Sequence, residues 1–116
     1  MAKVSIKIDG AKEITQGLQD AMMLAEVEAE VAERTEAIYD RSQAQVNVDT
    51  GRLKRSGSIT YEDELTMGVK YETPYAKLVH DGWTHYEGNP YLKNPFLIEQ
   101  EKFRNNLDAL FHGGGG

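Results

Sequence analysis

The chain begins with residues that alternate between apolar and polar side chains. Val4–Ile8 places an apolar residue at every second position, which is the period of a strand with one buried face. Asp9 and Gly10 then break the pattern, and either residue can cap a helix. The pattern therefore predicts an N-terminal strand followed by a helix.

A helical pattern without proline runs from about Ala11 to Gln45, with Gly17 as its only glycine. At 100° per residue its apolar positions fall on one broad arc, and acidic residues occupy the opposite face. The arc consists of Ile14, Leu18, Ala21, Leu24, Ala25, Ala32 and Tyr39, widened by Val27, Val31 and Ile38. The opposite face carries Glu26, Glu30, Glu33 and Asp40. We expect one long helix, or two shorter helices if the chain breaks near Gly17 or Ala21.

The length of this helix suggests how its apolar face is covered. A helix of about 35 residues is roughly 50 Å long, whereas a globule of this size has a radius of gyration of about 13 Å. A single helix would therefore overhang its own domain. We expect part of its apolar flank to pack against sister subunits. The residues assigned to this packing are Leu24, Val27, Val31 and Ile38.

Two further strands follow the long helical pattern. Ile59 and Tyr61 alternate with polar residues, and Asp63-Glu64 can turn the chain. The segment 65–72 then gives the clearest alternation in the sequence. These two segments predict an antiparallel hairpin, with the N-terminal strand added on an edge.

In the C-terminal part of the chain, two residues whose side chains can cap a helix each come directly before a proline. Thr73-Pro74 predicts a short helix that Gly82 ends in the left-handed conformation. Asn94-Pro95 predicts a last helix with an apolar side. That side consists of Phe96, Leu97, Phe103, Leu107, Leu110 and Phe111. The predicted fold is α+β, with a long N-terminal helix and a C-terminal helix packed on a small antiparallel sheet of about three strands.

Composition limits the possible classes of protein. The 116 residues are 40% hydrophobic and 28% charged, which fits one globular domain over residues 1–112. The remaining Gly113–Gly116 is expected to be a flexible tail. There is no cysteine, and no apolar run approaches the roughly 18 residues of a membrane span. We therefore expect a soluble protein that is made in the cytoplasm and has no membrane contact.

The net charge of −6 comes from 13 Lys and Arg against 19 Asp and Glu. This sign is wrong for a protein that grips nucleic acid through its whole surface. A local basic patch is nevertheless present after the long helix. It consists of Arg52, Lys54 and Arg55. This patch is either a solvated basic turn or a surface that meets an acidic neighbouring subunit or DNA phosphate.

The tripeptide Asp49-Thr50-Gly51 precedes this patch and allows two interpretations. In an aspartic protease, two such turns bring together two carboxylates that share a proton. Here the turn would follow a helix, and the adjacent cations would favour the ionised carboxylate instead. The simpler interpretation is a hinge in which Asp49 makes an Asx-type turn and Gly51 supplies a positive φ.

The remaining candidates for chemistry are weak. His80 and His85 have no third metal ligand at helical or hairpin spacing, and no phosphate-binding loop or nucleophile elbow is present. We expect no catalytic residue, no metal and no cofactor. The aromatic loop over residues 83–93 either folds back over the sheet or projects as an arm whose side chains anchor a protein interface. The predicted anchors are Trp83, Tyr86 and Tyr91.

Three segments together resemble the small head–tail joining proteins of long-tailed bacteriophages, also called minor capsid or tail-completion proteins. The long helix runs into Val48–Ser56, with the sequence VDTGRLKRS. Tyr75–Gly82, with the sequence YAKLVHDG, is similar to the family's Tyr-Ala-x-x-Val-x-x-Gly segment. Asn94–Leu97, with the sequence NPFL, opens the C-terminal helix. The three segments occur in the expected order and span nearly the whole chain.

This resemblance implies a non-enzymatic structural protein of the virion. Such a protein assembles in the host cytoplasm as a ring at the phage neck or tail end, where it joins the DNA-filled head to the tail. Its partners would be copies of itself and other neck, portal-adaptor or tail-tube proteins. DNA would pass through the lumen without sequence-specific binding, which suits the net negative charge. The alternative is a soluble, phage-encoded regulatory module that grips a host protein through the aromatic loop 83–93.

Overall fold

A computed structural model of the chain describes residues 2–46, 51–84 and 87–113. Its elements follow one another as β1 (Ala2–Ile8), α1 (Ala11–Thr15), α2 (Ala21–Gln45), α3 (Gly51–Arg55), β2 (Ser58–Asp63), β3 (Thr66–Thr73), α4 (Ala76–Asp81), α5 (Lys93–Asp108) and a π-helical turn (Ala109–Gly113). The chain therefore mixes helices with a three-stranded antiparallel sheet, and the predicted fold class is confirmed. The predicted glycine tail lies, apart from Gly113, outside the described residues.

The sheet has the strand order β1-β3-β2, so that β1 and β2 are its edges. Val69 of β3 pairs with Ile6 on one side and with Ile59 on the other. Because directly paired residues share a face of the sheet, the apolar side chains of all three strands point the same way. The alternation in the sequence thus predicted both the hairpin and the edge position of β1 correctly.

The helical pattern after β1 is interrupted between α1 and α2. Gly17 has a φ of 81°, which an α-helix cannot accommodate. Asp20 then caps α2, because its Oδ1 accepts hydrogen bonds from the backbone N–H of Met22 at 3.0 Å and of Met23 at 3.2 Å. The prediction of one helix over 11–45 is therefore wrong, and the alternative with a break near Gly17 is confirmed.

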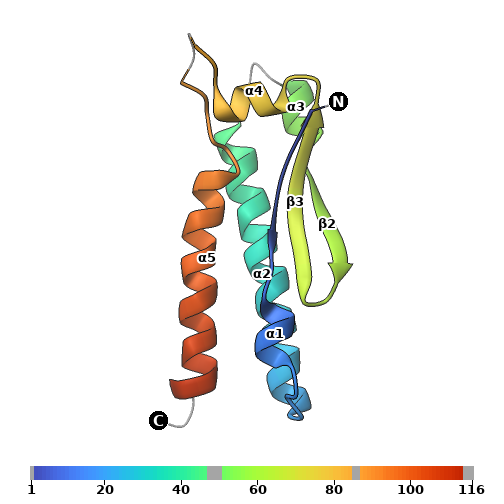
Figure 1. Cartoon of the computed structure of the whole chain (residues 1–116), viewed down its shortest axis with the longest axis vertical. Coiled ribbons are helices and arrows are strands. Elements are labelled where there is room, and N and C mark those ends of the chain that lie inside the picture. Colours follow the sequence, from blue (N-terminus) through green and yellow to red (C-terminus); the bar gives the residue numbers. More distant parts are fainter. Residues whose placement is uncertain (1, 47–50, 85–86, 114–116) are drawn as a thin grey trace.

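The three long elements lie side by side along the longest axis of the molecule. Figure 1 shows α2 with α5 on one side and the sheet on the other. The molecule measures 52 × 25 × 21 Å and has a radius of gyration of 16.1 Å, larger than the about 13 Å of a rounder domain. With 25 residues, α2 is about 37 Å long, so the elongated domain accommodates it without overhang.

Part of the apolar arc of α2 is consequently covered within the same chain, while Ala21 and Ala25 of that arc are exposed. Val27, Val31 and Ile38 are all 0% exposed, while Leu24 is half-buried. The prediction that these side chains are left for sister subunits is wrong for the first three. The prediction assumed a round domain, whereas the sheet and α5 extend along the helix and cover it.

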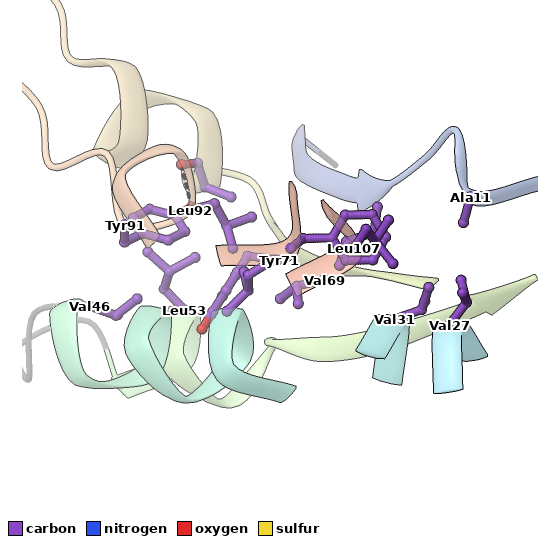
Figure 2. Packing of buried hydrophobic residues seen from close by; sticks show 14 residues of the cluster. Ala11, Val27, Val31, Val46, Leu53, Val69, Tyr71, Tyr91, Leu92 and Leu107 are labelled. Carbon is purple, nitrogen blue, oxygen red and sulfur yellow. Dashed lines mark hydrogen bonds between the residues drawn. The ribbon is translucent and has the colours of Figure 1, made fainter. Parts of the chain in front are cut away.

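The core runs along the molecule as a long cluster rather than a central ball. Figure 2 shows Val27, Val31 and Ala11 near one end of this cluster and Val46, Leu53 and Tyr91 near the other. Tyr71 of β3 lies between α2 and the loop that precedes α5. Its hydroxyl lies 2.6 Å from Ser42 Oγ and accepts a hydrogen bond from Gln43 Nε2 at 2.8 Å. Burial raises the pKa of Tyr71, an effect that these two hydrogen bonds partly offset.

The predicted boundaries of the last two helices are close to those observed. Thr73 Oγ1 accepts a hydrogen bond from the backbone N–H of Tyr75 at 3.3 Å. However, α4 begins at Ala76 with Tyr75 as its N-cap and no side-chain cap, so the prediction that Thr73 caps the helix and Pro74 opens it is wrong. Gly82 ends α4 with a positive φ of 85°, but its ψ of −177° lies outside the left-handed helical region, so that part of the prediction is wrong. At the start of α5, however, the N-cap is Leu92, and no side chain caps the helix. Pro95 is its third residue, within the first turn, where its missing N–H costs no helical hydrogen bond.

Candidate functional site

The predicted basic patch lies on α3. Arg52, Lys54 and Arg55 are exposed, and Leu53 between them is fully buried. The single inward-pointing leucine anchors the short helix in the core, so that its cations face the solvent. Within the described residues, none of these three cations makes an ion pair with an Asp or Glu side chain. This leaves their charge available to a partner.

Hydrogen bonds from other elements hold α3 in place. Gln43 Nε2 of α2 donates to the Lys54 carbonyl at 2.9 Å. Ser56 Oγ donates to the Leu53 carbonyl at 2.7 Å and accepts from the Glu72 backbone N–H at 3.2 Å. The basic patch is therefore fixed to both α2 and β3, as a surface that is to bind a partner in one orientation requires.

The predicted hinge is only partly described. Asp49 and Thr50 lie outside the described residues. Gly51 is the first residue of α3 and is not among the glycines with positive φ, so the expected left-handed conformation at this position is wrong. The helix continues directly from Gly51 because Leu53 is drawn into the core.

Charge is divided unevenly along the long axis. We call the residues 2–4, 51–58, 70–84 and 87–93 the basic end, because they place α3, α4 and the adjoining strand ends at one end of the molecule (Figure 1). It holds seven Lys or Arg against three Asp or Glu, a net charge of +4. The cations are Lys3, Arg52, Lys54, Arg55, Lys70, Lys77 and Lys93, and the anions are Glu72, Asp81 and Glu87. The other described residues hold six cations against fifteen anions, a net charge of −9.

An apolar groove of about 710 Å³ lies between α5 and the corner where β1 passes into α1. We call it the α5 groove. Its apolar walls are formed by Ile8, Ile14, Phe96, Phe103, Leu107 and Phe111. Four polar side chains or backbones, Asp9, Gln100, Arg104 and Asp108, also line it. Half of Ile14 is exposed, at 49%, so apolar surface remains open to the solvent in this groove.

The structure shows which of the apolar side chains predicted for one side of α5 are buried. Phe103 and Leu107 are buried, and Phe96, Leu110 and Phe111 are half-buried. Leu97 instead is 50% exposed, so its assignment to the covered side is wrong. The groove was not predicted, because it depends on how far α5 lies from β1 and α1.

A buried carboxylate joins α5 to α2. Glu99 is 0% exposed, and its two oxygens lie 2.7 Å from Arg34 Nη1 and 2.7 Å from Arg41 Nε. Arg34 also pairs with Glu33 at 2.9 Å and lies 3.1 Å from Glu30, although that last contact is not aligned as a hydrogen bond. A buried carboxylate needs such partners, because its desolvation is otherwise too costly.

Sequence reasoning missed this cluster, although one indication was available. Glu99 lies three residues after Phe96 and four residues before Phe103, so it shares their face of the helix. An acidic residue on the apolar face of a helix predicts a buried ion pair. The Arg partners, 65 and 58 positions away, could not be assigned from their spacing.

The aromatic loop does not project as one arm. Tyr91 is 0% exposed, and its hydroxyl donates to the Ala76 carbonyl at 2.8 Å. The loop is folded back on α4, since the Asn89 backbone N–H donates to the Val79 carbonyl at 2.7 Å. The prediction that Tyr91 anchors an interface is therefore wrong. Trp83 is 54% exposed, and Tyr86 lies outside the described residues.

His80 has both ring nitrogens engaged within the chain. Its Nδ1 lies 2.7 Å from Asp81 Oδ1, and its Nε2 accepts a hydrogen bond from the Lys93 backbone N–H at 3.2 Å. The accepting Nε2 places the proton on Nδ1, which donates to the carboxylate. Lys77 and then His80 hold the pKa of Asp81 below its ordinary value. His80 thus closes the loop onto α4 and leaves no nitrogen for a metal, while His85 lies outside the described residues.

The comparisons give no relative for this chain. No protein-family model, curated protein or solved structure matches it. Within the part of the chain that the structure describes, no three His, Asp or Glu side chains are grouped to hold a metal ion. None of the described helices is both long and apolar enough to cross a bilayer. The α3 patch and the α5 groove are the surfaces that remain as candidates for function.

Proposed function

We propose that this chain is a structural virion protein that forms an oligomeric ring at the neck or tail end of a long-tailed phage and joins the DNA-filled head to the tail. The observation that carries the proposal is the division of charge: +4 over the basic end and −9 over the other described residues. An elongated subunit with unlike ends attracts copies of itself in a head-to-tail manner, and such contacts close into a ring when the rotation permits.

The segments that resemble the head–tail joining family fall on parts of the fold that suit this role. The described part of Val48–Ser56 forms the exposed basic helix α3, and Tyr75–Gly82 forms α4 beside it (Figure 1). Asn94–Leu97 lies in the first turns of α5, which carries the groove. Two of the three segments therefore contribute to the basic end and the third to a wall of the groove.

The overall charge supports a channel through which DNA slides. With a net charge of −6, a ring of many copies would repel the phosphate backbone rather than hold it. Assembly would take place in the host cytoplasm, and neighbouring neck, portal-adaptor or tail-tube proteins would contact the two faces of the ring. We infer no catalytic activity for the chain, and its buried Glu99 and His80 side chains are engaged in contacts between elements.

A second candidate function is a regulatory module that binds a host protein. The exposure of Trp83, at 54%, favours it, because large aromatic side chains are common anchors in protein interfaces. Self-assembly separates the two functions. A ring protein forms large oligomers and is present in purified particles, whereas a regulatory module does neither.

Electron microscopy of phage particles tests the joining function directly. In a phage that encodes this chain, we expect particles made without it to separate into DNA-filled heads and finished tails. Supplying the chain from a plasmid should restore joined particles, which controls for effects on neighbouring genes. Joined, infectious particles in the absence of the chain would overturn the proposal.

A further inference from the structure

We propose that the basic end of one copy docks at the α5 groove of the next copy, with the cations of α3 facing the carboxylates that border the groove. This inference rests on the proposed function for the existence of self-association, and it assigns the two surfaces that meet. We assign a second copy as the partner because the exposed cations of α3 and the carboxylates at the groove carry opposite charges.

The α5 groove is built to bind an apolar element. Six apolar side chains from β1, α1, α5 and the final turn line its 710 Å³. Exposed apolar surface of this kind is characteristic of a site that a partner covers. Ile14 remains 49% exposed at its wall, so part of that surface is accessible to a docking chain.

The border of the groove is mainly acidic. Asp9 and Asp108 line it directly, and Glu13 is exposed on the adjoining α1. Arg104 is the one cation among the described lining residues. A partner that fills this groove is therefore favoured if it carries several cations around an apolar side chain.

The basic end has this combination. Arg52, Lys54 and Arg55 are exposed on α3 and make no ion pair within the described residues. By contrast, Lys7 and Lys12 pair with carboxylates of their own chain. On the neighbouring α4, Leu78 is 51% exposed and supplies an apolar side chain at the same end of the molecule.

The positions of the two surfaces determine the type of assembly. α3 and α4 lie at one end of the long axis, while α1 and the last turn of α5 lie at the other (Figure 1). A contact between two different surfaces is heterologous, so each copy keeps one unused surface for the next copy. Such a contact closes into a ring when the rotation between copies permits, which is the assembly that the proposed function requires, and otherwise gives an open filament.

Reversing the charges of both surfaces separately provides a decisive test. The first variant is Arg52→Glu, Lys54→Glu and Arg55→Glu, and the second is Asp9→Lys, Glu13→Lys and Asp108→Lys. Sedimentation velocity of the full chain should show that each variant alone associates at least tenfold more weakly than the wild type. An equimolar mixture should recover association, because each acidic surface then meets a basic one. Association of both variants at wild-type strength, or a wild type that stays monomeric at low salt, would overturn the proposal.

A third variant tests whether another acidic surface is the partner of α3. Glu26, Glu36 and Asp40 are exposed on α2 and provide the same number of charges for reversal to lysine. We expect this variant to associate as the wild type does. If it loses association while the groove variant keeps it, the α2 face is the docking surface and the proposal is wrong.

The apolar contribution has its own matched pair of variants. Ile14→Asp places a charge in the groove. Met22→Asp introduces the same charge at a side chain that is 77% exposed and does not line the groove. We expect only Ile14→Asp to weaken association, by about tenfold. Equal effects of the two substitutions would contradict docking at the groove. Circular dichroism of both variants checks that the fold is retained.

Nucleic acid is the other chemical class that could bind the cations of α3. Retardation of a duplex DNA fragment by the wild type and by the α3 variant measures this binding. If charge reversal on α3 abolishes DNA binding but leaves self-association unchanged, the basic end is a DNA surface and the proposal is overturned. If it abolishes self-association, the proposal is supported irrespective of the DNA result.

Failure of the docking proposal differs from failure of the proposed function. Particles that lack the chain and separate into heads and tails, but are rejoined by both charge-reversed variants, would refute docking and keep the joining function. Conversely, the expected behaviour of the charge-reversed mixture together with normal particles in the absence of the chain would refute the joining function alone.

Discussion

Glu99 of α5 forms an ion pair with Arg34 of α2, with 2.7 Å between Oε1 and Nη1. The second oxygen of Glu99 pairs with Arg41, which lies about two helical turns further along α2. Two arginines on one helix thus hold a carboxylate that is fully buried. This cluster fixes the position of α5 against α2, and the α5 groove, which Phe96 and Phe103 of the same helix line, depends on that position.

We expect Glu99→Gln to destabilise the fold by about 3 kcal/mol, because removing one member of a buried ion pair leaves the partner charges uncompensated. Denaturant unfolding followed by circular dichroism measures this change. Glu101→Gln, at an exposed position of the same helix, is the matched control and should change stability by less than about 0.5 kcal/mol. An unfolding midpoint of Glu99→Gln equal to that of the control would show that the cluster contributes nothing to stability.

We expect Tyr91→Phe to cost about 1 kcal/mol, the usual contribution of one hydrogen bond. The substitution keeps the ring against Tyr71, whose centroid is 4.9 Å away, but removes the donor to the Ala76 carbonyl. Thermal unfolding compares this variant with Tyr61→Phe, where the side chain is 61% exposed and little change should follow. Identical stabilities of the two variants would contradict the role assigned to the Tyr91 hydroxyl.

Two glycines allow steric and conformational effects to be separated. A Cβ at Gly57 would lie 2.5 Å from the Tyr71 ring, so we expect Gly57→Ala to cost about 2 kcal/mol through overpacking. A Cβ at Gly17 would have no neighbour within 4 Å, but the backbone there has a φ of 81°. We expect Gly17→Ala to cost about 1 kcal/mol from this strain alone. Chemical denaturation measures the loss of stability of both variants. A larger loss for Gly17→Ala than for Gly57→Ala would contradict the prediction.

The sequence predicted the parts of the fold that depend on local patterns. The alternation in β1, β2 and β3 fixes which side chains share a face, and the observed pairing of Val69 with Ile6 and Ile59 agrees with it. The sequence did not decide whether the helix breaks at Gly17, because a single glycine is tolerated within a helix. What settles the break is the cap that Asp20 provides to α2.

The positive φ expected at Gly51 and the cap expected from Asn94 were local errors, but the incorrect predictions that bear on function concerned contacts between distant segments. Val27, Val31 and Ile38 were assigned to a subunit interface on the assumption of a round domain, but the sheet and α5 cover them. Tyr91 was assigned to an exposed arm, but the hydrogen bond from Asn89 to Val79 folds its loop inward. Such contacts join residues far apart in the chain, and residue spacing alone does not report them.

The contribution of Asp81 to stability depends on pH. Its pKa lies below the ordinary value of 3.8, chiefly through the hydrogen bond with Lys77 and then through His80. A carboxyl group with a lowered pKa in the folded state stabilises that state above its unfolded pKa, and the stabilisation is lost as pH falls through the folded pKa.

Because the Asp81 side chain is 46% exposed, we expect Asp81→Asn to cost only about 0.5 kcal/mol at neutral pH. The difference from the wild type should shrink as pH falls through the lowered pKa of folded Asp81, and it should vanish where the carboxyl group is protonated in both states. Denaturant unfolding at a series of pH values measures the gap, and a gap that persists unchanged in acid would show that Asp81 acts through its shape rather than its charge. Asp40→Asn, at an exposed carboxylate of α2 that makes no ion pair within the described residues, serves as the control that should show no such dependence.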